Sequence, residues 1–180
     1  MSFFWKFILK IISWKCEISV SIPDKTVICV APHTSNWDFI LGLVAYRAYG
    51  RKANFLMKEF WFFFPLKYLL YYFGGIPVKK GGNSLTQSLV EKFKSVSYLN
   101  LAVTPEGTRK STTNWRTGFL YIANGANVPI TLAVIDYKNK IISINDIFYP
   151  SGNIEEDMAE IKKFYAGKKE LAKFPEKFIV

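Results

Sequence analysis

The sequence predicts an α/β fold: a single domain with a mostly parallel or mixed central sheet flanked by helices. Three observations support this prediction. Short runs typical of strands alternate along the chain with longer runs typical of helices. The 180 residues fit one domain with a sizeable core, and no repeat or low-complexity linker divides them. Three polar clusters follow predicted strands, and α/β folds usually bind ligands beyond the carboxyl ends of strands.

The first 16 residues are expected to form an amphipathic helix ahead of a domain that spans residues 17–180. Lys6 and Lys10 fall on a narrow polar stripe of this helix, and aromatic and aliphatic residues cover the rest. Such a face suits a helix lying in the membrane interface. The segment is too short to span a bilayer, and a cleaved signal peptide is not expected. The alternative is a helix packed on its own core.

The first half of the domain shows strand signals on both sides of a helix. Residues 17–22 alternate between polar and apolar, as a strand does, and residues 26–31 form a short apolar run typical of a buried strand. Pro65 is expected to interrupt a very aromatic helix. In order, this half is predicted to contain strands at 17–22 and 26–31, a helix at 36–49, a strand at 53–57 and a helix at 58–72.

The second half continues the alternation. Acidic residues gather at the start of the last helix and lysines later, which complements the helix dipole. The predicted elements are a strand at 75–79, a helix at 84–95, a strand at 98–104, a helix at 116–124, strands at 128–135 and 140–148, and a helix at 153–172.

The segment 60–73 is dominated by Phe, Tyr, Trp and Leu. Core packing is the default explanation for aromatic residues at helical spacing. Because Lys67 lies within the segment and the N-terminal helix is equally aromatic, we expect part of it to contact lipid or to hold an acyl chain.

Composition narrows the function classes. The formal charge is +10, from 24 Lys and Arg against 14 Asp and Glu, and it favours nucleic acid, phosphorylated metabolites or acidic lipids as partners. The chain is half hydrophobic, which excludes a disordered tail. Cys16 and Cys29 are the only cysteines and His33 the only histidine, so a structural zinc site is not expected. Cys29 lies in an apolar run and should be a buried, reduced thiol.

His33 and Asp38 form the first candidate pair. Ser35 is a good N-cap residue, and Asp38 three residues later occupies the capping-box position. If a helix starts at Ser35, Asp38 points back toward its N-terminus and can accept the Nδ1–H of His33, leaving Nε2 free to receive a proton. The alternative is a loop histidine beside an ordinary helix cap. A catalytic pair here should activate a substrate hydroxyl directly, because no nucleophile motif accompanies it.

Two basic clusters follow other predicted strands. In PEGTRK, Arg109 comes just after a turn at Gly107 and can fork onto two phosphate oxygens. In KKGG, Lys80 precedes a flexible turn and offers a point charge to phosphate. Lys58 is a weaker candidate for the same ligand. The alternative is that Glu106 and Arg109 only hold a loop together and that the lysines are solvated.

The chain resembles the glycerolipid acyltransferases, the lysophosphatidic acid acyltransferase family. HTSNWD, from His33 to Asp38, resembles the H-x-x-x-x-D motif of that family. Two departures are Lys80, where the family usually has arginine, and Thr104, where it usually has phenylalanine. Three further blocks of the family follow in order: GGIPVKK at 74–80, TPEGTR at 104–109 and VPI at 128–130.

The resemblance implies an O-acyltransferase that moves a fatty acyl group from acyl-CoA or acyl-carrier protein to the hydroxyl of a lysophospholipid such as 1-acylglycerol-3-phosphate. His33 would be the general base and Asp38 the residue that orients it. The acyl donor is a co-substrate, and no cofactor or metal is expected. The residues implied in acceptor binding are Lys58, Lys80, Glu106, Gly107, Thr108 and Arg109.

The expected partners are a membrane lipid surface, the acyl donor and the lysolipid, without nucleic acid. The expected location is the cytoplasmic face of a membrane, as a peripheral or monotopic protein. Two alternatives remain open. The same chemistry could act on another acceptor, such as a lysolipid built on an amino acid or another alcohol. A non-catalytic basic module for membranes or nucleic acid would explain the charge and the aromatic residues but not the ordered blocks.

Overall fold

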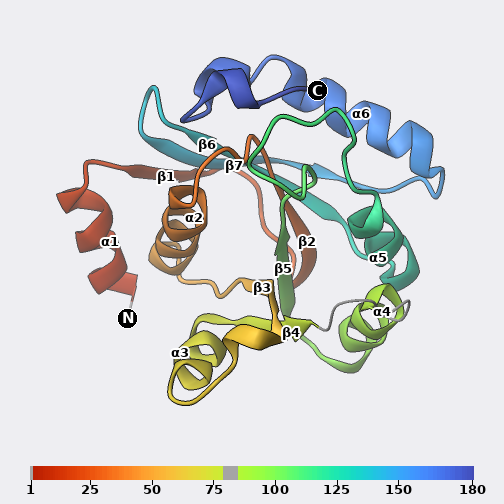
Figure 1. The fold of residues 1–180 in the computed structure, drawn as a ribbon, viewed down its shortest axis with the longest axis horizontal. Helices are drawn as coiled ribbons and strands as arrows, with labels where there is room; N and C mark the ends of the chain where they lie inside the picture. The colour runs from red at the N-terminus through yellow and green to blue at the C-terminus, as the bar shows by residue number, and fades with distance from the viewer. Residues whose placement is uncertain (1, 79–84) are drawn as a thin grey trace.

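The computed structural model describes residues 2–78 and 85–180 and shows one seven-stranded sheet with helices on both faces (Figure 1). The strand order is β1-β7-β6-β2-β5-β3-β4. Strands β2 to β6 run parallel, whereas β7 is antiparallel to β6, and β1 is parallel to β7. The predicted α/β fold with a mixed sheet is therefore confirmed. The strands are β1 (Lys15–Ile18), β2 (Lys25–Val30), β3 (Asn54–Lys58), β4 (Gly75–Val78), β5 (Leu99–Val103), β6 (Ile130–Asp136) and β7 (Ile141–Phe148).

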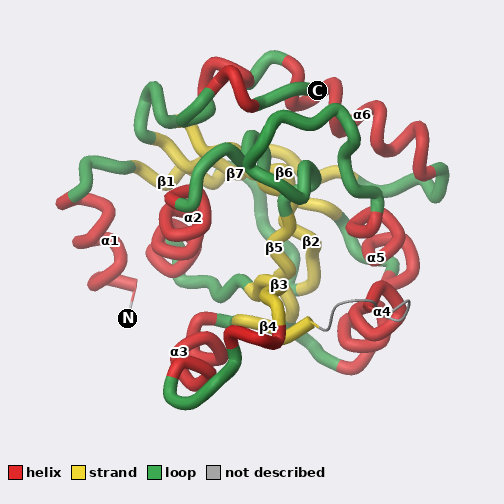
Figure 2. Tube along the Cα trace, viewed as in Figure 1, coloured by secondary structure: helices red, strands yellow, loops and turns green. Residues whose placement is uncertain are grey.

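The helices form a layer on each side of the sheet (Figure 2). Apolar residues of α4, α5 and α6 pack in one core cluster with β2, β5 and β6, and residues of α1 and α2 pack in another with β6 and β7. The short helix α3 follows β3 and contacts β4. The helices are α1 (Ser2–Ile11), α2 (Trp37–Ala48), α3 (Leu66–Phe73), α4 (Leu85–Ser95), α5 (Gly118–Ala126) and α6 (Ile154–Ala166), with 3₁₀ turns η1 (Glu59–Trp61), η2 (Lys169–Leu171) and η3 (Pro175–Lys177).

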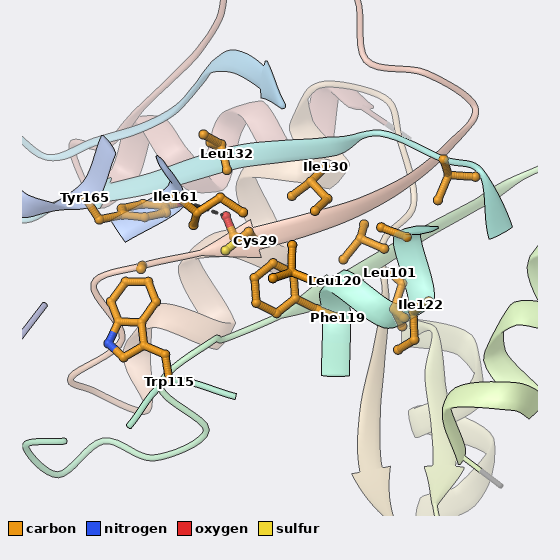
Figure 3. Packing of buried hydrophobic residues seen from close by; sticks show 14 of the residues in the cluster. Cys29, Leu101, Trp115, Phe119, Leu120, Ile122, Ile130, Leu132, Ile161 and Tyr165 are labelled. Carbon is orange, nitrogen blue, oxygen red and sulfur yellow. Dashed lines mark hydrogen bonds between the residues drawn. The ribbon is translucent and has the colours of Figure 1, made fainter. Parts of the chain in front are cut away.

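Strand β2 is buried on both faces, as its continuous apolar run predicts. Val27 and Cys29 pack toward α4, α5 and α6, whereas Ile28 packs on the opposite face, because successive side chains of a strand alternate. Figure 3 shows the first of these faces. There the Tyr165 hydroxyl donates to the carbonyl of Cys29 at 2.8 Å, so a buried polar group of α6 is satisfied by the sheet.

Several boundaries differ from those predicted. The first strand ends at Ile18, and the aromatic segment 58–72 divides into η1 and α3. Pro65 is the N-cap of α3, where its missing N–H breaks no helical hydrogen bond. The last long helix stops at Ala166, next to Gly167, and the remaining chain forms two 3₁₀ turns.

Helix α1 packs along one side only. Leu9 is buried against the α2 layer, and α1 has many contacts with α2. The Trp5 ring meets the Phe73 ring of α3 edge-on, with 6.4 Å between ring centroids. The other side of α1 leaves Phe3 and Phe7 exposed. In the part of the chain that the structure describes, no helix has the length and apolarity needed to cross a bilayer.

Candidate active site

Two of the predicted polar clusters, HTSNWD and PEGTRK, meet at one edge of the sheet because the strands that precede them are parallel neighbours. Cys29 of β2 lies beside Val103 of β5, and Phe55 of β3 lies beside Ala102. The segments after β2 and β5 therefore leave the same edge, and the exposed Lys58 ends β3 there. Lys80 lies outside the described residues.

His33 and Asp38 are in direct contact. The Nδ1 atom of His33 is 3.0 Å from Oδ2 of Asp38. That same oxygen accepts the backbone N–H groups of Thr34 at 2.9 Å and Ser35 at 2.8 Å, while the Ser35 hydroxyl accepts the N–H of Trp37. Asp38 thus points back over the start of α2, as its position in the first turn predicted. The helix itself starts at Trp37 with Asn36 as its N-cap, one residue later than the predicted N-cap Ser35.

The electrostatics of this pair favour an ionised Asp38. Its side chain is 2% exposed and that of His33 is 14% exposed. Burial disfavours the carboxylate, but hydrogen bonds from His33, Tyr137 and the Ser35 N–H outweigh burial and hold the pKa of Asp38 below its usual value. A carboxylate on Nδ1 fixes the ring orientation and leaves Nε2 free to take a proton.

Tyr137 was missed by sequence reasoning. Its hydroxyl donates to Oδ1 of Asp38 at 2.5 Å, although the two residues are 99 positions apart. Tyr137 directly follows β6, so its place just beyond a predicted strand was the only available signal. No local spacing connects it with Asp38.

Glu106 is hydrogen-bonded to the loop that carries His33. Its Oε1 atom accepts the backbone N–H of His33 at 2.8 Å, and within the described chain its buried Oε2 atom has no hydrogen-bond partner. Burial raises the pKa of Glu106 and the charge of Asp38 adds to this, whereas the backbone N–H groups of His33 and of Glu106 itself oppose it. The sequence assigned Glu106 to the acceptor; its contact in the structure is with the backbone of His33.

The PEGTR turn lies against the HTSNWD loop. The Arg109 guanidinium donates to the side-chain oxygen of Asn36, which joins the two motifs directly. Gly107 has φ +63°, and a Cβ atom there would lie only 3.0 Å from Cγ of Arg116, so the turn needs glycine. Thr108 accepts the backbone N–H of Lys110 at 3.2 Å and stabilises the turn.

A cavity of about 450 Å³ lies between α2 and the sheet and includes the His33–Asp38 pair in its wall. Such a volume is within the usual range of small-molecule sites. His33, Asp38 and Arg109 line it at the carboxyl edge of the sheet, and Val30, Ile135 and Ile144 are among the apolar residues that line the remainder. Gly42 of α2 also lines it, and a Cβ atom there would have no neighbour within 4 Å.

The described residues contain no group of His, Cys, Asp and Glu side chains arranged to hold a metal ion. The polar groups that do converge are one imidazole, two carboxyl groups and one guanidinium, drawn from the loops after β2 and β5 and from the first turn of α2. This arrangement can accept a proton from a hydroxyl at the mouth of an apolar cavity.

Two comparisons with known proteins found similar proteins. The model of the Acyltransferase family matches residues 14–136, which include His33, Asp38 and the PEGTR turn. The fold is similar to the crystal structure of the 1-acyl-sn-glycerophosphate (LPA) acyltransferase PlsC from Thermotoga maritima, with a TM-score of 0.64 and 18% identity over 93% of this chain and 78% of that chain. A comparison with curated proteins found no match. Because the family model covers more than half of the sequence, the chain belongs to the Acyltransferase family and is an O-acyltransferase.

Proposed function

We propose that this protein transfers a fatty acyl group from a thioester, acyl-CoA or acyl-carrier protein, to the hydroxyl of a lysophospholipid such as 1-acylglycerol-3-phosphate. The observation that carries this proposal is the contact between His33 and Asp38 in the wall of an apolar cavity. The fold likeness to a 1-acyl-sn-glycerophosphate acyltransferase supports the choice of acceptor.

His33 acts as the general base. Its Nε2 atom takes the proton of the acceptor hydroxyl while the oxygen attacks the thioester carbonyl. The tetrahedral intermediate collapses, the C–S bond breaks and the new C–O ester bond remains. The leaving thiolate receives the proton from the imidazolium, so His33 is regenerated. Asp38 stabilises the imidazolium during this cycle, and base catalysis of this kind typically contributes about 10²–10⁴-fold.

The cavity holds the acyl chain of the thioester donor. Its lining away from His33 is apolar, and burying a methylene group contributes about 0.8 kcal/mol. A chain that enters beside His33 would bring its carbonyl carbon next to the base. This placement also removes the reacting carbonyl from bulk water, which strengthens the electrostatic interactions around it.

Arg109 binds the phosphate of the acceptor. It is exposed, it donates to Asn36 of the histidine loop, and it lines the same cavity as His33. A guanidinium can donate two parallel hydrogen bonds to phosphate oxygens. Lys58, at the end of β3, and Lys80 supply further positive charge to the same headgroup in this proposal.

The protein works at the cytoplasmic face of a membrane as a peripheral or monotopic protein. Exposed aromatic residues on α1 and on the segment 60–72 support this, because the contact of Trp5 with Phe73 makes the two segments neighbours. Lys6 and Lys10 are exposed on α1, and anionic lipids of the cytoplasmic leaflet attract lysines near the surface. The exposed large hydrophobic residues of the two segments are Phe3, Phe4, Phe7, Ile11, Phe60, Trp61, Phe63, Phe64, Tyr68, Leu69, Tyr71 and Tyr72.

The catalytic proposal is tested by thiol release from acyl-CoA and from acyl-carrier protein across a panel of lysolipids. We expect 1-acylglycerol-3-phosphate to drive release and His33→Ala to abolish it, with an unchanged circular dichroism spectrum. Tyr149→Ala, an exposed residue beyond β7, is the matched control. Release with an amino-acid lysolipid but not with the phosphate acceptor would assign another acceptor, and wild-type turnover by His33→Ala would reject the mechanism.

The membrane proposal is tested by flotation with lipid vesicles that contain or lack anionic phosphatidylglycerol. The wild type should float with anionic vesicles, and a variant with Phe3→Ser and Phe4→Ser should remain in the soluble fraction. Tyr149→Ser removes an equally exposed aromatic residue elsewhere and should float like the wild type. Equal flotation of all three proteins would overturn the assignment of this surface.

A further inference from the structure

We propose that Tyr137 is a positioning residue of the reaction, which acts by fixing the second carboxylate oxygen of Asp38. The hydroxyl of Tyr137 donates to Oδ1 of Asp38 at 2.5 Å. Tyr137 lies one position beyond the region that the family model matches and outside all four sequence blocks. The role is therefore assigned by the fold of this chain and not by its motifs.

The two oxygens of Asp38 have separate tasks. Oδ2 faces His33 at 3.0 Å and accepts the backbone N–H groups of Thr34 and Ser35. None of these three donors reaches Oδ1, which has Tyr137 as its hydrogen-bond donor. A carboxylate with a donor on each oxygen cannot rotate about its Cβ–Cγ bond without losing charge-assisted hydrogen bonds. Tyr137 thereby keeps Oδ2 on the imidazole.

Tyr137 is itself held by its surroundings. Its backbone N–H donates to the carbonyl of Leu171 at 2.8 Å. Its ring meets the ring of Trp14 edge-on, with 5.1 Å between centroids. Tyr137, just after β6, is therefore in contact with both the segment before β1 and the 3₁₀ turn η2. Its position depends on the ring and the backbone, so removal of the hydroxyl alone should leave that position unchanged.

The groups that face Tyr137 keep its hydroxyl a donor. Burial raises the pKa of Tyr137 well above its usual value, and both the hydrogen bond and the charge of Asp38 raise it further, whereas the Ser35 hydroxyl opposes this. Lys173 of the C-terminal segment lies with its Nζ atom 5.8 Å from the Tyr137 ring. The phenol is protonated throughout the pH range in which acyl transfer can be assayed.

Tyr137→Phe removes the hydroxyl and retains the ring. Because a hydrogen bond to a charged group is worth about tenfold in rate or more, we expect kcat to fall about tenfold while KM for donor and acceptor stays within about twofold. Tyr137 is one of the donors that lower the pKa of Asp38. Its loss raises that pKa and makes the carboxylate a stronger acceptor for the protonated imidazole, so the acidic limb of the kcat/KM profile should move toward higher pH.

This inference rests on the proposed function, since Tyr137 acts through the base that His33 supplies. Tyr149→Phe, with an exposed hydroxyl beyond β7, is the matched control and should resemble the wild type. An inactive His33→Ala variant together with wild-type kcat and pH profile in Tyr137→Phe overturns the role of Tyr137 alone. Full activity of His33→Ala removes the proposed mechanism itself. A rise in KM without a change in kcat or in the pH profile would also contradict positioning.

Discussion

The backbone N–H of His33 donates to the buried carboxyl group of Glu106 at 2.8 Å, which ties the loop after β2 to the turn after β5. The two residues are 73 positions apart in the sequence. The hydrogen bond from His33 partly offsets the burial that disfavours the charge of this carboxyl group. The HTSNWD segment is thus held in place by a residue of the TPEGTR segment.

Glu106→Gln and Glu106→Ala should differ in stability. The raised pKa of Glu106 means that its charged form costs stability above its unfolded pKa, and glutamine keeps an oxygen acceptor for His33 without that charge. The free energy of unfolding of Glu106→Gln at pH 7 should equal or exceed that of the wild type. Glu106→Ala leaves the His33 N–H without its partner and should lose about 1–3 kcal/mol. Urea unfolding measures both, and equal losses would contradict the hydrogen-bond account.

Stability at acidic pH should depend on Asp38. Its folded-state pKa is lowered, so the carboxylate stabilises the fold above its unfolded pKa, and this stabilisation is lost as pH falls through the lower folded value. The free energy of unfolding should decline below about pH 5, with a shallower decline in Asp38→Asn. Urea unfolding at several pH values provides the comparison. Parallel curves for the two proteins would show that Asp38 does not contribute to this dependence.

Substitution of Gly42 should change acyl-chain preference. This residue lines the cavity, and a side chain there has open space. Gly42→Ala should raise the free energy of unfolding by about 0.5–1 kcal/mol, because glycine is unfavourable inside a helix. Gly42→Leu fills the cavity and should shift thiol release toward shorter acyl donors.

The control for Gly42→Leu is Gly167→Leu. Gly167 is also free of neighbours around a Cβ atom but is exposed at the end of α6. Its donor profile should match that of the wild type. An unchanged chain-length profile in Gly42→Leu would show that the acyl chain does not use this cavity.

Removal of Arg109 should weaken binding of a phosphate-bearing acceptor. A charge-assisted hydrogen bond to phosphate is worth about 1.5–3 kcal/mol, so Arg109→Ala should raise KM for 1-acylglycerol-3-phosphate about tenfold or more. Lys110→Ala removes the neighbouring exposed charge and serves as the control. Steady-state kinetics with a monoacylglycerol acceptor, which lacks phosphate, should show little effect of either change. Equal losses on both acceptors would contradict phosphate binding.

Much of the site could be predicted because its key geometry is local or follows from strand direction. His33 and Asp38 are five residues apart and meet through the cap of one helix. The loops after β2 and β5 meet because those strands are parallel neighbours. Tyr137 could not be predicted, because its contact with Asp38 depends on where β6 ends relative to α2. The acceptor assignments of Lys58, Lys80, Glu106, Gly107, Thr108 and Arg109 stay predictions.

The boundaries of the helices and strands were also predictable in part only. The apolar run of β2 identified a buried strand, because burial on both faces requires apolar residues at every position. Residues 58–72 were predicted as a very aromatic helix interrupted by Pro65. The structure has a 3₁₀ turn and a separate short helix instead. Propensity did not decide where the chain turns between β3 and β4.

The sequence by itself determined the α/β class, the family and the local pair of imidazole and carboxylate. Periodicity and short-range hydrogen bonds are properties of neighbouring residues, so they can be read along the chain. Only the tertiary structure decided the partners of that pair, Tyr137 and Glu106, and the apolar cavity beside it. These contacts join segments far apart in sequence, and their distances are fixed by the register and packing of the whole sheet.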